Sequence, residues 1–121
     1  ANHLLPKFRF EKRFYGLKLL EESGLFEHLA SCPEIKTAIL FGSFSRGDWG
    51  RSSDIDLFIY GKDSQFNQGK FEHLLNREIQ LFSYPTLEKA KAFLEPTVLK
   101  NIAKGFYITE KDFPFEVNIH G

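Results

Sequence analysis

The fold is decided by residues 35–60, which read IKTAILFGSFSRGDWGRSSDIDLFIY. Residues 35–41 are largely apolar and lie between a proline and a glycine, which predicts an interior strand. Residues 54–60 predict a second strand, because apolar side chains occupy every second position. The segment between them, residues 42–53, is rich in Gly, Ser, Arg and Asp and predicts a turn with about one helical turn in it. The stretch therefore predicts two core strands joined by a polar turn.

The flanking sequence predicts helices and further strands in alternation. Helices are expected over residues 7–20, from residue 25 to the Cys32-Pro33 pair, over 67–77, from Pro85-Thr86 onward, and from Glu95-Pro96 to Gly105. Strands are expected over residues 78–84 and 106–108. In so short a chain, we expect these alternating strands and helices to form one sheet covered by helices. This arrangement predicts the α+β class, α/β-like, with a small mixed β-sheet flanked by helices.

Length and composition limit the possible classes of protein. A chain of 121 residues forms one domain, and 42% hydrophobic residues are enough for a packed core. The 16 basic and 16 acidic residues give a net charge of zero, which argues against binding nucleic acid by bulk charge. The single cysteine excludes an intramolecular disulfide and favours an intracellular, cytoplasmic protein. No apolar run reaches the ~20 residues of a membrane span, so no membrane contact is expected.

The first expected helix, over residues 7–20, is amphipathic and basic. Phe10, Phe14 and Leu17 fall at positions i, i+4 and i+7, which predicts one apolar face. The basic residues of this helix are Lys7, Arg9, Lys12, Arg13 and Lys18. They form either a solvated face, which is the favoured interpretation, or a contact surface for a partner or a nucleic acid.

The chain contains no methionine and begins Ala1-Asn2-His3, so we expect it to be a piece of a longer protein. On this interpretation, residues 1–32 are an N-terminal helical segment that could connect to a further N-terminal domain. Residues 33–110 form the core of the fold, and residues 111–121 form an irregular tail.

The polar turn and the start of the second strand carry the candidate chemistry. Gly42 permits a tight turn and a close approach of a ligand to the backbone. Ser43 would begin a helix, where free N–H groups and the hydroxyl favour an anion such as a phosphate. Asp54 and Asp56 are two residues apart on a strand and share one face, and Mg²⁺ bound by carboxylates and substrate phosphates would relieve their repulsion. A phosphate cradle beside a carboxylate metal site is suited to phosphoryl or nucleotidyl transfer.

Gly42-Ser43, then ten residues, then Asp54-x-Asp56 resembles the signature of the DNA polymerase beta nucleotidyltransferase superfamily. The flanking Arg46-Gly47 and the Ser53-Asp54-Ile55-Asp56-Leu57 run resemble most its small members, the minimal nucleotidyltransferases. The resemblance covers about residues 35–84. It implies a nucleotidyltransferase fold for the core of the chain.

The resemblance also implies roles for these residues. Gly42 and Ser43 hold the triphosphate of a nucleoside triphosphate, with ATP expected, and Arg46 contacts a phosphate unless it is an ordinary exposed loop arginine. Asp54 and Asp56 are catalytic and bind divalent ions, with two Mg²⁺ expected during catalysis. The implied reaction moves a nucleoside monophosphate from the nucleotide to a hydroxyl acceptor on a protein or an RNA.

One position departs from the superfamily pattern. A third carboxylate is expected on the next strand, but the sequence Glu78-Ile79-Gln80 puts Gln80 in its place. Glu78 lies on the same strand face, displaced by ~6–7 Å, and is either a substitute catalytic carboxylate or a solvent-facing residue. The alternative function is therefore a catalytically degenerate nucleotide-binding or interaction module. The resemblance implies for it an antitoxin-like role beside a HEPN-domain protein, whereas nucleic-acid binding through the basic first helix is less favoured.

Overall fold

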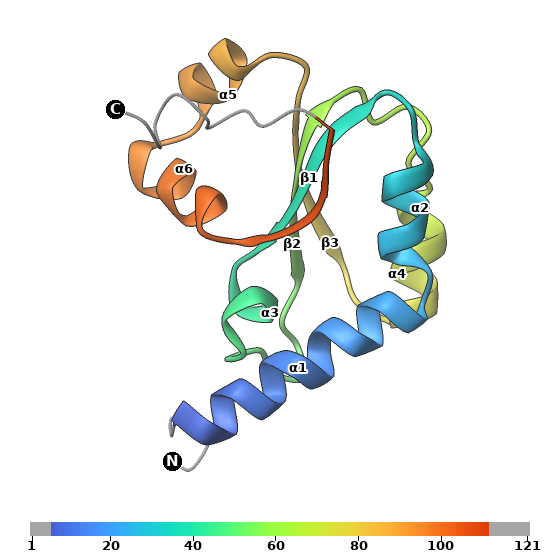
Figure 1. Cartoon of the computed structure of the whole chain (residues 1–121), viewed down its shortest axis with the longest axis vertical. Coiled ribbons are helices and arrows are strands. Elements are labelled where there is room, and N and C mark those ends of the chain that lie inside the picture. The colour runs from blue at the N-terminus through green and yellow to red at the C-terminus, as the bar shows by residue number, and fades with distance from the viewer. Residues whose placement is uncertain (1–5, 112–121) are drawn as a thin grey trace.

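The computed structural model describes residues 6–111. Within these residues the helices and strands follow in the order α1 (Pro6–Glu22), α2 (Leu25–Ser31), β1 (Ile35–Phe41), α3 (Ser43–Arg46), β2 (Ile55–Gly61), α4 (Gln68–Leu75), β3 (Ile79–Tyr84), α5 (Leu87–Phe93), α6 (Pro96–Ala103) and β4 (Phe106–Glu110). Figure 1 shows the sheet at the centre, with α2 and α4 on one side and α5 and α6 on the other. The irregular tail expected after residue 111 lies outside the described residues.

The four strands form one sheet in the order β3-β2-β1-β4. Strand β1 pairs antiparallel with both β2 and β4, whereas β2 and β3 run parallel. The sheet is therefore mixed, and the α+β class predicted from the sequence is confirmed. Strands β2 and β3 each begin one residue later than predicted, so Asp54 and Glu78 lie directly before a strand rather than within it.

Both faces of the sheet are covered, and the alternation of side chains divides the core in two. Ala38 and Leu40 of β1 pack with Leu57 of β2 against α1, α2 and α4. Ile39 of β1 and Phe58 of β2 point the other way and pack against α5 and α6. The strand face that carries Asp56 is thus covered by helices over part of its length. Within residues 6–111, no helix is long and apolar enough to cross a membrane.

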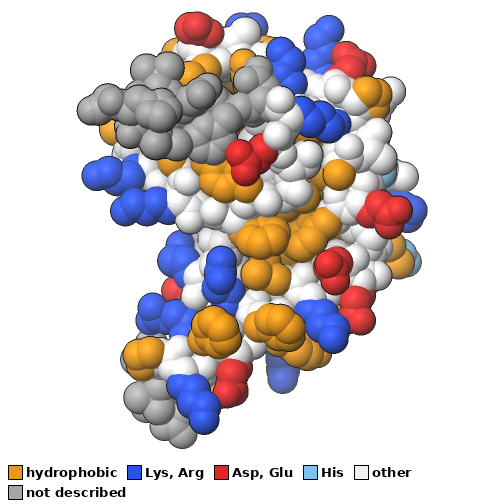
Figure 2. Space-filling model, viewed as in Figure 1, with side chains coloured by type: hydrophobic (Ala, Val, Ile, Leu, Met, Phe, Trp, Pro, Cys, Tyr) orange, Lys and Arg blue, Asp and Glu red, His pale blue; other side chains and the backbone are white. Residues whose placement is uncertain are grey.

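The inward face of α1 is only in part the face that the sequence predicts, because Leu17 packs against the core but the two phenylalanines do not. Phe10 and Phe14 are 68% and 64% exposed. The buried residues of α1 are Gly16 and Leu20. A side chain at position 16 would collide with the Trp49 ring, so Gly16 is what permits close contact with the segment after α3. Figure 2 shows the exposed hydrophobic side chains among basic ones on the lower part of the molecule, where α1 runs.

Candidate functional site

The polar turn after β1 and the start of β2 meet at Gly42 and Asp56. The backbone of Gly42 has φ 74° and ψ −154°, a conformation that is essentially restricted to glycine. A Cβ at this position would overlap the carboxylate of Asp56. The antiparallel register pairs Phe41 with Asp56 and so fixes this neighbourhood. The backbone of the turn therefore lies directly against a carboxylate, as the motif spacing led us to expect.

The turn continues into α3, a single helical turn that closes on the Gly42 carbonyl. The N–H groups of Ser45 and Arg46 both donate to Gly42 O at 3.2 Å. The Ser45 hydroxyl donates to the same oxygen at 2.9 Å. Within residues 6–111, the Ser43 hydroxyl has no hydrogen-bond partner. Of the two serines in this turn, Ser43 is therefore the one whose hydroxyl is free to meet a ligand.

Asp54 and Asp56 form the acidic part of the site, and both are partly buried. Burial, and next the negative charge of Asp54, raise the pKa of Asp56 above its usual value, while the positive charge of Arg46 opposes this rise. Such a pair favours a cation beside it. Within the described residues, no group of three or more His, Cys, Asp or Glu side chains could hold a metal ion. Two carboxylates suit Mg²⁺, which takes few protein ligands and completes its coordination with phosphates and water.

Arg46 lies at the end of α3, beside this acidic pair. Its side chain is 55% exposed and its Nε forms an ion pair of 3.2 Å with Oδ2 of Asp48. An exposed pair of this kind contributes little to stability and exchanges readily for another partner. Arg46 can therefore turn from Asp48 toward an incoming anion without a large loss of folding energy.

The position of the expected third carboxylate is occupied by an amide. The parallel register pairs Gln80 of β3 directly with Asp56 of β2, so their side chains lie next to each other on one face. Glu78 is exposed and lines a different hollow, together with His73 and Arg77. The structure thus brings Gln80, rather than Glu78, into the cleft that contains Asp56.

That cleft has a volume of about 550 Å³. One side consists of Gly42, Arg46 and Asp56, and the neighbouring residues of the sheet are Phe41, Gln80 and Phe82. The other side comes from the end of α5 and from α6, with Phe93, Leu94, Glu95, Val98 and Asn101. Ser43 and Asp54 are not among the lining residues, although each is the direct or near neighbour of one that is.

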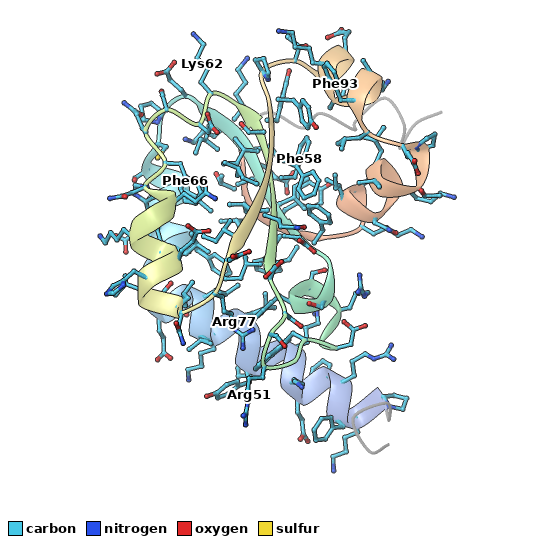
Figure 3. The ribbon with its side chains drawn as sticks, turned by 180° about the vertical axis from the view of Figure 1, so that it is seen from behind. Arg51, Phe58, Lys62, Phe66, Arg77 and Phe93 are labelled. Atoms are coloured by element: carbon cyan, nitrogen blue, oxygen red, sulfur yellow. The ribbon has the colours of Figure 1, made fainter. Side chains whose placement is uncertain are left out.

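Sequence reasoning missed the residues that hold the polar turn in place. Arg77, which precedes β3, donates from one guanidinium nitrogen to Gly50 O at 2.9 Å and to Ser53 O at 2.8 Å. Its guanidinium also lies 5.0 Å from the ring centroid of Phe44 and 5.3 Å from that of Trp49. Figure 3 shows Arg77 at the end of the sheet where α1 passes, while the labelled Arg51 points outward. A lone arginine after a helix carries no sequence signal that would reveal this role.

Trp49 links the same turn to α1. Its ring stacks on that of Phe44, with centroids 4.9 Å apart and an interplanar angle of 4°. Its indole nitrogen donates to Lys12 O at 3.1 Å, and Nε of Arg13 donates to Ser45 O at 2.6 Å. Two basic residues of α1 thus take part in contacts that support the turn rather than in a wholly solvated face.

The chain matches one family model and is similar to several solved structures. A family model described as Polymerase beta, Nucleotidyltransferase matches residues 25–112. The chain is similar in structure to a toxin–antitoxin crystallised with AMP-PNP, at 21% sequence identity and a TM-score of 0.48, over 81% of this chain and 73% of that one. The chain is also similar to a mutant of the toxin–antitoxin MntA–HpeT, at 18% sequence identity and a TM-score of 0.48, over 81% of this chain and 73% of that one. A third similar structure is that of a protein from Sulfolobus solfataricus, provisionally described as a nucleotidyltransferase. Its sequence identity is 23% and the TM-score is 0.40, over 81% of this chain and 91% of that one. No curated protein sequence matches the chain.

Proposed function

The chain belongs to the polymerase beta nucleotidyltransferase family, and from this premise we propose that it binds a nucleoside triphosphate with Mg²⁺ and transfers the nucleoside monophosphate to a hydroxyl acceptor. The observation that carries the proposal is the contact between the Gly42 backbone and the Asp56 carboxylate. A phosphate on that turn and a cation on that carboxylate would be immediate neighbours. Such proximity is what metal-assisted displacement at a phosphate requires.

Each residue of the site has a distinct role in this proposal. Asp54 and Asp56 hold the divalent ions, and the raised pKa of Asp56 reflects a carboxylate that a cation would stabilise. The Gly42 backbone and the free Ser43 hydroxyl position the terminal phosphates, and Arg46 leaves Asp48 to neutralise them. When bound, Mg²⁺ would polarise the phosphoryl oxygens and neutralise charge on the leaving pyrophosphate. ATP is the expected nucleotide.

The proposed transfer also requires a group that accepts the proton of the attacking hydroxyl. Gln80 lies beside Asp56, but an amide does not act as a base at neutral pH. Glu78 stays a prediction as the catalytic carboxylate, and it lines a different hollow from the one that contains Asp56. It would have to reach the acceptor after a change of side-chain conformation or through water.

A calorimetric titration with ATP, in the presence and absence of Mg²⁺, tests the proposed site. We expect binding that depends on Mg²⁺ and that is lost in Asp54→Asn and in Asp56→Asn, since each removes a negative ligand while keeping the shape of the side chain. Asp63→Asn is the matched control, because it removes the same charge from the loop that follows β2. Binding that ignores Mg²⁺, or that survives both substitutions, would contradict the assignment.

A second candidate function is supported by Gln80 in the third position and by the place of Glu78 outside the cleft. The chain would then be a nucleotide-binding module without transferase activity, and family resemblance suggests a HEPN-domain protein as its partner. Incubation with ATP labelled at the α-phosphate, in an extract of the native source, separates the two. Label on a protein or an RNA that is lost with Asp56→Asn supports the transferase. Tight Mg²⁺–ATP binding with no transfer of label supports the module.

A further inference from the structure

The cleft beside Asp56 extends onto a surface that the proposed chemistry leaves unused. This surface is formed by the end of α5 and by α6, and its exposed large hydrophobic side chain is Phe93, at 74%. An exposed phenylalanine is common at a protein surface, but this one lines the same cleft as Asp56 and Gly42. Figure 3 shows Phe93 at the far end of the molecule from Arg77, beyond the point where β3 ends.

The residues on the α5–α6 side differ in chemistry from those around Asp56. The cleft's basic residue is Arg46, on the side of the polar turn. The α5–α6 side is apolar, with Phe93, Leu94 and Val98, and its polar groups are the amide of Asn101 and the carboxylate of Glu95. Such a surface repels a phosphate and accepts a planar, uncharged group that can form hydrogen bonds. A cleft of about 550 Å³ is also within the range that a small-molecule ligand of nucleotide size occupies.

The ring of Phe93 is held in place although it is exposed. It stacks on Tyr84, with ring centroids 6.3 Å apart and an interplanar angle of 16°. Tyr84 in turn lies 6.4 Å from the ring of the buried Phe58 in β2. One side of the Phe93 ring is thus backed by a row of aromatic side chains that reaches into the core. A supported aromatic ring with exposed area is a suitable platform for stacking a base.

From this juxtaposition we propose that the α5–α6 side of the cleft binds the nucleobase of the nucleotide, with Phe93 as its stacking platform. The inference rests on the proposed function, because the turn at Gly42 and the carboxylate of Asp56 define where the phosphates lie. A nucleotide with its phosphates there can extend along the cleft past Gln80 toward Phe93. The amides of Gln80 and Asn101 supply donors and acceptors for the polar edge of the base.

Parallel titrations with Mg²⁺–ATP and with Mg²⁺–tripolyphosphate test the proposal, because the second ligand has the phosphates but no base. We expect Phe93→Ala to weaken ATP binding about tenfold, since stacking on an aromatic side chain contributes that much per base. Binding of tripolyphosphate should not change. Phe93→Trp should keep the affinity for ATP. Phe10→Ala and Phe14→Ala are matched controls, because they remove similarly exposed rings from α1 and should leave both ligands unaffected.

The outcomes separate this inference from the proposed function. If Phe93→Ala binds ATP as tightly as the unchanged chain does, the base does not stack on Phe93 and the inference is overturned. Equal affinity of the unchanged chain for ATP and for tripolyphosphate overturns it as well, while the proposed phosphate and metal site stands. If the unchanged chain binds neither ligand, the proposed function and the inference fail together. Thermal melts confirm that each variant is folded, and we expect Phe93→Ala to stay folded because the side chain is 74% exposed.

Discussion

The two sides of the cleft are built in different ways. Residues 42–53, on the side of the polar turn, are held by hydrogen bonds from Arg13 and Arg77 and by the packing of Trp49 on Phe44. Residues 93–101, on the side of α5 and α6, are mostly exposed, and several of them line the cleft. One side is fixed by contacts from α1 and from Arg77, whereas the other is formed by the end of α5 and by α6.

This difference matches the two tasks that we assign to the cleft. Metal and phosphate binding requires oxygen and N–H groups held to a fraction of an ångström, so the supporting contacts belong on that side. Recognition of a base by stacking tolerates small displacements better than metal coordination does, because the contact is spread over the area of two rings. Changes on the side of the polar turn should therefore affect stability and binding together, and changes on the α5–α6 side should affect binding alone.

The largest effect is expected from Gly42→Ala. The new Cβ would overlap the Asp56 carboxylate, and the backbone conformation at position 42 is one that alanine avoids. Strain of this kind destabilises by about 1–3 kcal/mol. The carboxylate must also move, so Mg²⁺-dependent ATP binding should be lost. Chemical denaturation and calorimetry of the same variant measure the two effects.

Gly69→Ala is the matched control for this substitution. Gly69 lies in α4, and no atom of the described residues is within 4 Å of a Cβ built there. Replacing a helical glycine by alanine stabilises by up to about 1 kcal/mol. The prediction is wrong if the two glycine variants change stability by the same amount and in the same direction.

A smaller effect is expected from Arg77→Met, which keeps much of the side-chain length and removes the donors to Gly50 and Ser53. Hydrogen bonds from a charged group contribute about 1.5–3 kcal/mol, and the partial exposure of Arg77 places the expected loss near the low end, at about 2 kcal/mol. ATP affinity should fall as well, because the loop before Asp54 is released. Phe93→Ala, on the other side of the cleft, should change stability by less than about 0.5 kcal/mol. Equal destabilisation by the two variants would remove the distinction between the sides.

The elements of the fold could be predicted largely from the sequence, because their signals are local. The apolar run 35–41 coincides with β1, and Pro96 begins α6 as proposed from its place after Glu95. Asp56 was identified because the alternation of a strand and the spacing from Gly42 are both properties of one short stretch. The contact between those two residues follows once the strands are paired in register.

What could not be predicted depends on contacts between distant segments. The helical spacing of Phe10 and Phe14 indicates an apolar face, but only the tertiary structure reveals that Gly16 faces the core, because Trp49 needs the space that a side chain would fill. The hydrogen bonds of Arg77 to Gly50 and Ser53 join residues more than twenty positions apart, as does the cleft that Phe93 shares with Asp56, and no local pattern encodes either. The sequence therefore identifies candidate groups for the site, but it does not identify the groups that hold them in place.

A small effect, opposite in sign to those of Gly42→Ala and Arg77→Met, is expected at Asp56. Burial and the charge of Asp54 raise the pKa of this carboxyl in the folded protein above the value near 3.8 that it has in the unfolded chain. The folded state therefore binds the proton more tightly, so this contribution to stability is complete below the unfolded pKa and is lost as the pH rises through the folded pKa. Asp56→Asn should remove this loss of stability at higher pH, because an amide does not ionise.

We thus expect Asp56→Asn to be slightly more stable than the unchanged chain at neutral pH without Mg²⁺, and to lose this advantage as the pH falls toward 4. Thermal melts from pH 4 to pH 8 measure the difference. Added Mg²⁺ should raise the Tm of the unchanged chain and not that of the variant, because a ligand that binds only the folded state stabilises it. A variant that is less stable at neutral pH would mean that Asp56 supports the fold in its charged form. The acidic pair would then belong to the structural contacts of the polar turn rather than to a site that requires a cation.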